Sequence, residues 1–225
     1  LEDAWTFGGN LTYYLPFGGQ GKSYISMDFF RTQFTDQMVV DYDRNFSEIW
    51  LYRLKSLPSP QSFSNNFQLD FYCEPVRRLS ITATFRYTDA RQTYWNTGLV
   101  EKPMTSRYKG VLNIQYATNL NKWIFDFTAS VNGPCRVYDF MTSYPQYADG
   151  VTPVYPLLYL QVTRRFKGVD LYIGGENLTN FKQKDPILGA SDVRTPLFDA
   201  SCIWGPITGI KAYAGVRFTL WKTEK

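Results

Sequence analysis

Strict alternation of apolar and polar residues marks four segments of the chain. Along 79–88 the odd positions read Leu, Ile, Ala, Phe, Tyr and the even positions Ser, Thr, Thr, Arg, Thr. The segments 67–74, 123–132 and 211–220 alternate in the same way, and weaker versions occur at 5–16, 22–34, 106–118, 156–166 and 169–177. Because successive side chains of a strand point to opposite faces, this period of two predicts nine β-strands. Helical periodicity is not convincing anywhere in the chain.

The two faces of these strands differ in chemistry. One face carries aliphatic and aromatic side chains, and the other carries amides, hydroxyls and charges. A barrel wall with lipid outside and water inside shows this contrast, and about 9–11 tilted residues suffice to cross a bilayer. A soluble β-sandwich, for example a carbohydrate-binding one, also alternates and is the competing interpretation. No apolar run of about 18 residues exists, so no membrane helix is expected.

The connections between strands alternate between short and long. Short connections occur at 18–21, 74–78, 118–122 and 167–170, and long ones at 43–62, 92–106, 133–154 and 178–208. Outer-membrane barrels have short periplasmic turns and longer extracellular loops, so this pattern assigns the two sides and puts the C-terminus in the periplasm. Nine strands then place the N-terminus outside. Since an open sheet leaves unpaired edges in lipid, we expect 1–225 to be one section of a larger wall.

Composition agrees with a membrane wall and argues against nucleic acid. The 6 Trp, 17 Tyr and 17 Phe make up 18% of the chain, and aromatic girdles at both membrane interfaces require such numbers. The net charge is +4, yet the basic residues fall in turns such as Arg77-Arg78 and form no stripe with stacking rings. No nucleic-acid partner is therefore expected, whereas lipopolysaccharide is a suitable partner for loop cations.

Histidine is absent, which limits the chemistry that the chain can perform. Without it, Ser-His-Asp and Cys-His catalysis and His-based metal sites are excluded. We expect no enzyme, no catalytic residues, no cofactor and no resident metal. Carboxylates at Asp41, Asp43 and Glu48 leave a calcium site open as a minor alternative, although the strict calcium-loop pattern is missing.

The three cysteines form no CxxC pair. Cys73 lies on an alternating apolar face, whereas Cys135 and Cys202 fall in loops on the same side of the expected wall. A disulfide between Cys135 and Cys202 stays open, because spacing alone cannot establish its geometry.

One long loop is dense in side chains suited to ligand binding. Aromatic and cationic side chains can hold planar or amphipathic ligands. Self-packing of the loop and a girdle for lipid headgroups are the alternatives. The candidate ligand-binding residues in 133–154 are Arg136, Tyr138, Phe140, Met141, Tyr144 and Tyr147.

Several motifs resemble the TonB-dependent receptors of Bacteroidetes-type bacteria. FFRTQFTDQMVVD at 29–41 resembles a strand-and-loop signature of that family, and ENLTNF at 176–181 resembles its strand end near the C-terminus. FDAS at 198–201, WGP at 204–206 and YAGVRFTL at 213–220 look like the last loop and the closing strand. The family usually ends near that strand, whereas this chain continues to Lys225.

The resemblance implies a fold and a function. The fold is an all-β, antiparallel transmembrane β-barrel of twenty-two strands around a plug, of which these nine strands are the C-terminal portion. The implied function is active transport of a scarce nutrient across the bacterial outer membrane. TonB would supply the energy through a plug that 1–225 lacks, and a surface lipoprotein partner is conceivable. The alternative is a complete small barrel that acts as an adhesin, anchor or scaffold.

Overall fold

The computed structural model describes residues 2–17, 23–45, 48–194 and 198–219. Its elements are β-strands joined by short 3₁₀ turns, and no helix among these residues is long and apolar enough to cross a bilayer. The elements are β1 (Asp3–Tyr14), β2 (Tyr24–Asp36), β3 (Met38–Asn45), β4 (Glu48–Arg53), η1 (Leu54–Ser56), β5 (Ser62–Val76), β6 (Leu79–Tyr94), β7 (Gly98–Glu101), β8 (Tyr108–Ala117), η2 (Asn119–Asn121), β9 (Trp123–Asn132), η3 (Asp139–Ser143), η4 (Pro145–Tyr147), β10 (Tyr155–Phe166), β11 (Val169–Glu176) and β12 (Lys211–Phe218).

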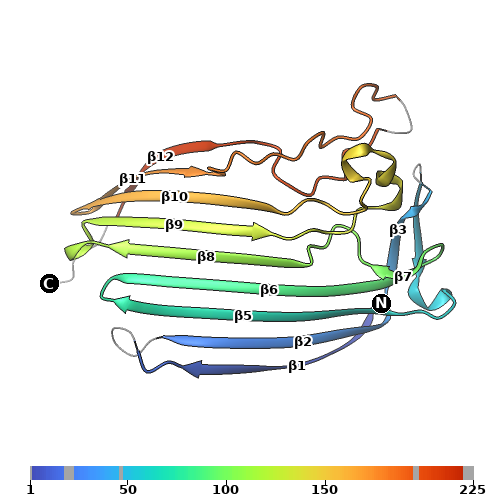
Figure 1. Cartoon of the computed structure of the whole chain (residues 1–225), viewed down its shortest axis with the longest axis horizontal. Coiled ribbons are helices and arrows are strands. Elements are labelled where there is room, and N and C mark those ends of the chain that lie inside the picture. Colours follow the sequence, from blue (N-terminus) through green and yellow to red (C-terminus); the bar gives the residue numbers. More distant parts are fainter. Residues whose placement is uncertain (1, 18–22, 46–47, 195–197, 220–225) are drawn as a thin grey trace.

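Nine strands form one continuous antiparallel wall (Figure 1). Their order is β1-β2-β5-β6-β8-β9-β10-β11-β12, so each strand pairs with the next wall strand along the chain. These are the nine strands that the alternation predicts, and the all-β antiparallel prediction is confirmed. Three further strands lie outside the nine predicted ones. β7 lies in the expected connection 92–106 and pairs with the end of β6, and β3, which begins before the expected connection 43–62, pairs with β4 in a separate hairpin.

One face of the wall is a continuous polar surface. Cross-strand registers align Asn10, Asp28, Gln68, Arg86 and Lys109 in one row. The side chains bond along and across the strands, as when the Asn113 amide donates to Asp126 and Thr128 at 3.0 and 2.8 Å. Such hydrogen bonds between opposite strands hold the register and keep this face compatible with water.

The opposite face is apolar and uncovered. The next register row carries Leu11, Met27, Leu69 and Phe85, followed by Gly110. Further along, Ile173 keeps 63% of its surface exposed. In the part of the chain that the structure describes, no second sheet packs on this face, as a soluble sandwich would require. A wide apolar surface of this kind needs lipid or protein to cover it.

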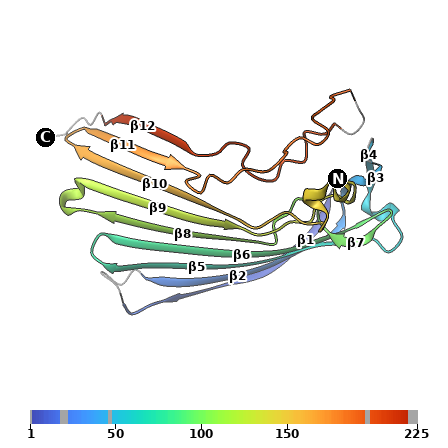
Figure 2. The same cartoon turned by 45° about the horizontal axis from the view of Figure 1, so that its top comes forward.

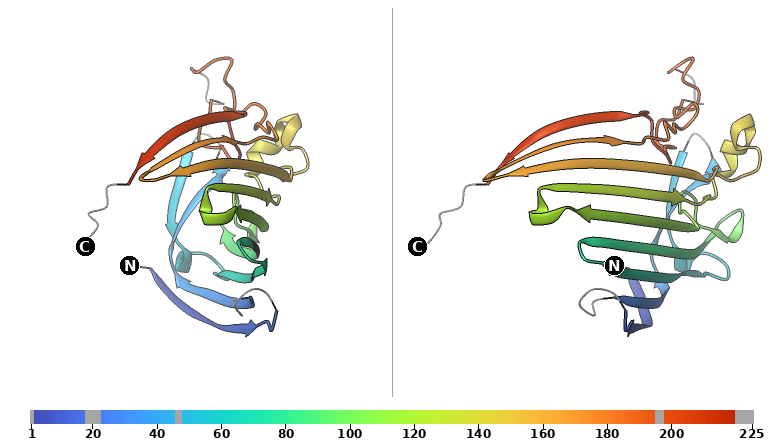
Figure 3. Two further views of the ribbon diagram at one scale, coloured as in Figure 1. Left: turned by 90° about the vertical axis from the view of Figure 1, so that its left-hand side faces the viewer. Right: turned by 60° about the vertical axis from the view of Figure 1, so that its left-hand side comes forward.

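The wall is curved and open (Figure 3). Viewed along the strands, it forms an arc, and the β3–β4 hairpin crosses the hollow at its far end. That hairpin packs on Phe34 and Tyr94, which project from the same side as the polar row, so the polar face is the concave one. The end strands β1 and β12 do not pair with each other. The alternative of a closed small barrel therefore has no support here.

Connections sort to the two ends of the wall as their lengths predict (Figures 1 and 2). One end carries the turns β5–β6, β8–β9 and β10–β11, and the last of these uses Gly168 at φ +75°, where a side chain would be strained. The other end carries β3, β4, β7, η3, η4 and the segment before β12 (Figure 2). We call these the turn end and the loop end.

Candidate ligand-binding loops

The loop between β9 and β10 folds around its own apolar residues. Two short 3₁₀ turns, η3 and η4, reverse the chain so that Val137, Met141 and Tyr147 point inward. There they meet Leu188 and Cys202 from the segment before β12. Two of the long loops thus share one small core, which gives the loop end a defined shape.

The six candidate binding residues divide into two groups. Met141 and Tyr147 are 0% and 1% exposed within this core, in the position that self-packing of the loop requires. Tyr138, Phe140 and Tyr144 pack against the core while keeping part of their rings accessible, and Arg136 is also partly exposed. Only this second group can contact a ligand without opening the loop.

Arg136 ties the loop to the β3–β4 hairpin. Its guanidinium lies 3.0 Å from an oxygen of Asp43 on β3 and also pairs with Asp139 of its own loop. The second Asp43 oxygen accepts the backbone N–H of Asp139 at 2.5 Å. Burial raises the pKa of the Asp43 carboxyl, and the bonds from Asp139 and Arg136 offset only part of that cost.

Aromatic rings continue from this ion pair. Tyr42 and Tyr138 have ring centroids 5.0 Å apart, and the Tyr138 ring stacks on Phe140 with centroids at 5.8 Å. Burial raises the pKa of Tyr138 to about 12, so its phenol stays neutral at physiological pH. The hairpin and the loop together present a ring surface, which we define as Tyr42, Tyr138 and Phe140.

The β3–β4 hairpin packs on a buried cluster of its own. Val39, Leu54, Leu57 and Tyr94 form a second buried cluster between the hairpin, η1 and the tip of β6. In addition, Arg53 pairs with the buried Asp36 at the end of β2. The ring surface therefore stands on packed elements and not on a free loop, which favours a preformed site.

Tyr147 and Gln183 organise the junction with the segment before β12. The Tyr147 hydroxyl accepts the indole N–H of Trp204 and the amide of Gln183, both at 3.1 Å. The Gln183 oxygen accepts the backbone N–H groups of Trp204 and Gly205. These bonds fix the Trp204 indole, which also packs on the ring of Tyr155.

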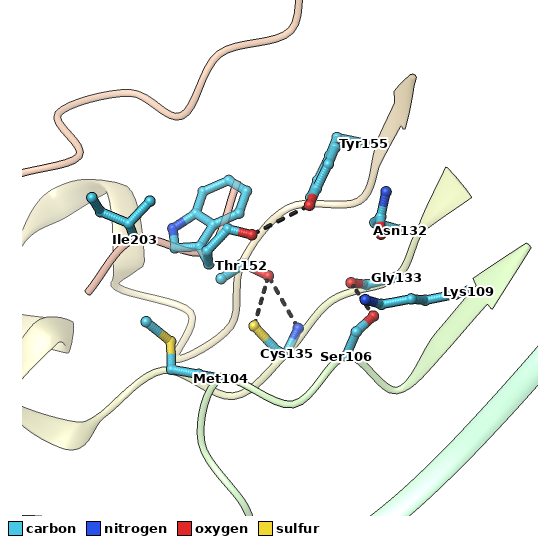
Figure 4. A pocket seen from close by; sticks show the side chains of 10 residues that line it. Met104, Ser106, Lys109, Asn132, Gly133, Cys135, Thr152, Tyr155 and Ile203 are labelled. Carbon is cyan, nitrogen blue, oxygen red and sulfur yellow. Dashed lines mark hydrogen bonds between the residues drawn. The ribbon is translucent and has the colours of Figure 1, made fainter. Parts of the chain in front are cut away.

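A pocket of about 180 Å³ lies beside Trp204, where the loops meet the polar face (Figure 4). Lys109 and Asn132 line this pocket from the loop-end termini of β8 and β9. Among the described residues, no carboxylate forms an ion pair with Lys109. Sequence reasoning missed this pocket because four distant segments build it. The lining residues are Met104, Ser106, Lys109, Asn132, Gly133, Cys135, Thr152, Tyr155, Ile203 and Trp204.

A second pocket of about 160 Å³ shares Trp204. Phe181 and the exposed Lys182 and Lys184 line it together with Tyr147. The two pockets thus combine three lysines with a fixed indole, an arrangement that suits small ligands carrying negative charge and flat rings.

Among the described residues, the cysteines form no disulfide, and cysteines and carboxylates together form no metal site. All three cysteines are free thiols, so the disulfide left open between Cys135 and Cys202 is not formed. In the described part of the chain, no group of three His, Cys, Asp or Glu residues could hold a metal ion. The carboxylates considered for calcium serve other partners, because Asp43 binds Arg136 and Asp41 accepts the hydroxyl of Tyr52.

Comparisons with known proteins agree on the fold alone. No protein-family model and no curated protein matches the chain. Among solved structures, the siderophore receptor PiuA from Acinetobacter baumannii matches 96% of this chain with a TM-score of 0.61 at 16% identity. The ferric enterobactin receptor PfeA from Pseudomonas aeruginosa, in complex with enterobactin, matches 95% with a TM-score of 0.60 at 14% identity.

The matched structures are longer than this chain. The chain covers 28% of PiuA and 31% of PfeA, which is between about a quarter and a third of each. The FpvA receptor of P. aeruginosa bound to pyoverdines gives a TM-score of 0.60 at 10% identity, with 27% covered. The chain therefore has the fold of a section of outer-membrane receptor β-barrels.

Proposed function

We propose that residues 1–225 form the C-terminal section of the barrel of a TonB-dependent transporter that imports a scarce small ligand. The observation that carries this proposal is a curved wall whose concave face is polar and whose convex face is apolar. Its loops gather at one end, and its fold matches receptor barrels over 95–96% of the chain. The remaining wall, the plug and the segment that engages TonB would come from outside this section.

Each part of the section has a physical role in such a transporter. The concave polar face keeps the path wet, the apolar face meets lipid, and the loops capture the ligand without covalent chemistry. We place the loop end outside the cell and the turn end, with the C-terminus, in the periplasm. Lipopolysaccharide would then surround the loop end. The Bacteroidetes type and a surface lipoprotein partner stay predictions.

We infer that the ligand is an anionic metal chelate. Two of the solved neighbours are named as a siderophore receptor and a ferric enterobactin receptor, and FpvA is described as bound to pyoverdines. In this chain, the pockets beside Trp204 carry Lys109, Lys182 and Lys184. Cations and flat rings at one place suit such chelates. The partly exposed Tyr138 and Phe140 pack against the same loop core as Trp204.

The first experiment locates the complete protein and measures its ligands. We expect it in the outer-membrane fraction, soluble only with detergent, and able to bind iron chelates in a panel followed by tryptophan fluorescence. Recovery as a soluble protein without detergent would overturn the membrane assignment. A membrane protein that binds no chelate, and whose deletion leaves iron uptake unchanged, would overturn the metal chelate as the transported ligand.

Variants then test the loop surface. We expect Tyr138→Ala with Phe140→Ala to weaken binding of the best chelate by about tenfold or more, because buried ring contacts contribute about 1–2 kcal/mol each. Leu120→Ala is the matched control, since this exposed residue lies in the η2 turn at the opposite end. Equal affinities for all three proteins would move the site away from these loops.

A further inference from the structure

Arg164 lies on the apolar face of the wall at its turn end, whereas Arg31 and Arg91 lie on the same face toward the loop end. Along β10 the side chains of Leu158, Leu160 and Val162 share this face, and Arg164 and Phe166 continue the same row at the turn end. The guanidinium carbon lies 4.7 Å from the ring centroid of Trp123 and 5.3 Å from that of Phe166. The rings hold the cation at the edge of the apolar belt.

The surroundings of Arg164 are complete within this chain. β10 lies between β9 and β11, so Trp123 and Leu171 flank Arg164 whatever closes the rest of the wall. Among the described residues, no carboxylate pairs with Arg164. The nearest candidate, Asp170, belongs to the polar face and pairs with Arg165 at 3.2 Å. With no carboxylate partner among the described residues, this guanidinium is available to an anion from outside the protein.

Many cations at the loop end are matched within the chain. Four arginines pair with carboxylates there: Arg53 with Asp36, Arg91 with Asp89, Arg107 with Glu101, and Arg136 with Asp43. Arg31, on the apolar face, donates instead to the amide oxygens of Asn65 and Gln33. At the turn end, the two turns that flank Arg164 carry Lys122 and Lys167, and the more distant β5–β6 turn carries Arg77 and Arg78. None of these four cations forms an ion pair among the described residues.

The turn-end carboxylates do not neutralise this excess on the apolar side. Glu74 belongs to the polar face, where it accepts the Tyr72 hydroxyl at 2.6 Å, and Asp170 is taken by Arg165. Lys122 and Lys167 lie at the two hairpin turns that flank Arg164, and both are exposed. The rim therefore presents positive charge directly above an apolar surface, which matches the layout of an anionic phospholipid.

We propose that Arg164, seated between Trp123 and Phe166, binds the headgroup phosphate of an anionic phospholipid in the periplasmic leaflet. The guanidinium donates to the phosphate oxygens, the flanking lysines add charge, and the acyl chains lie along Val162 and Leu160. This site rests on the membrane placement proposed above, but it is independent of the transported ligand.

Native mass spectrometry of the complete protein, released from detergent, tests the site. We expect dioleoyl phosphatidylglycerol to be retained at least about fivefold more strongly than dioleoyl phosphatidylcholine, since one cation at a membrane surface is worth about that factor. Arg164→Gln should remove most of this preference. Arg91→Gln is the matched control, because Arg91 lies on the same face at the loop end and is paired with Asp89.

The outcomes separate this site from the transport proposal. If Arg164→Gln no longer shows the heat-dependent electrophoretic shift of a folded barrel, Lys167→Gln in the exposed turn replaces it, with a smaller loss of the preference expected. Equal retention of both lipids, an unchanged preference in the variants, or a preference for lipopolysaccharide would overturn the phospholipid site. A protein that needs no detergent would instead overturn the proposed function.

Discussion

At the scale of single residues, burial decides what the loop thiols can do. Cys202 lies in the loop core, and its sulfur is 3.5 Å from a carboxylate oxygen of Asp199. Burial, together with this negative charge, raises the pKa of Cys202 to about 12. Cys135 bonds with the Thr152 hydroxyl, and burial raises the pKa of its thiol as well. Since the thiolate is the reactive form, both thiols have low reactivity in the folded protein.

We therefore expect Cys135 and Cys202 to resist alkylation by iodoacetamide at pH 8 until the loop end unfolds. Mass spectrometry of tryptic peptides, with and without denaturant, measures this. Because folding raises the pKa of the Cys202 thiol from 9.0 to about 12, the stability of the protein also depends on pH. The contribution of this thiol to the free energy of unfolding is complete below pH 9 and is lost as pH rises from 9 toward 12. Rapid labelling of Cys202 in the native protein would show that the loop core opens.

At the scale of elements, Asn177 joins the end of β11 to the segment that leads into β12. Its amide donates to the carbonyls of Phe181 and Thr208 at 2.8 and 3.0 Å. Its oxygen accepts from the Thr179 hydroxyl and the Phe181 N–H. The backbone there has φ 51°, which asparagine tolerates better than most residues. The ENLTNF motif thus has a local structural role.

We expect Asn177→Ala to destabilise the complete protein by about 2–4 kcal/mol, because the backbone groups that bond the Asn177 side chain are left without a hydrogen-bond partner. Guanidinium unfolding in detergent measures the change. Asn180→Ala is the control: it has nearly the same φ, 53°, but its side chain accepts one long bond, from Ile210 at 3.4 Å. Equal losses in both variants would assign the effect to backbone strain and not to the amide network.

Strands were predictable where alternation is undisturbed, and loops were not. The segment 123–132 coincides with β9. The strand predicted at 79–88 continues to Tyr94, which alternation missed because the next apolar-face positions are the polar Asp89, Arg91 and Thr93. The β3–β4 hairpin went unseen, since β4 lies inside the expected long connection 43–62, β3 begins just before it, and the two strands pair only with each other. Among the binding candidates, composition could not separate the inward Met141 from the outward Phe140.

The pocket beside Trp204 was hidden from sequence reasoning for a related reason. Lys109 occupies an ordinary polar position of β8, and nothing near it in the sequence marks a site. It gains significance only because the segments around Cys135, Thr152 and Trp204 converge on it in space. Long-range convergence of this kind depends on loop packing, which a period of two does not encode.

At the scale of the whole molecule, the assignment of lipid to one face can be tested with two adjacent residues. Val111 and Leu112 sit at the middle of β8 and are similarly exposed, at 43% and 37%. Their hydrophobicity does not distinguish them, but their registers do. Val111 lies between Thr84 and Ser130 on the polar face, whereas Leu112 lies between Ala83 and Ala129 on the apolar face.

An arginine substituted at each position should lower the free energy of unfolding by different amounts on the two faces. Because a charge at the bilayer midplane costs about 2–4 kcal/mol on the lipid side of a barrel, Leu112→Arg should destabilise the protein in phospholipid vesicles by that amount. Val111→Arg points into the hollow of the wall and should cost less than about 1 kcal/mol, since water can solvate the guanidinium there. Reversible unfolding in vesicles measures both. The reverse order would put lipid on the concave side, and equal small costs would remove the bilayer from both faces.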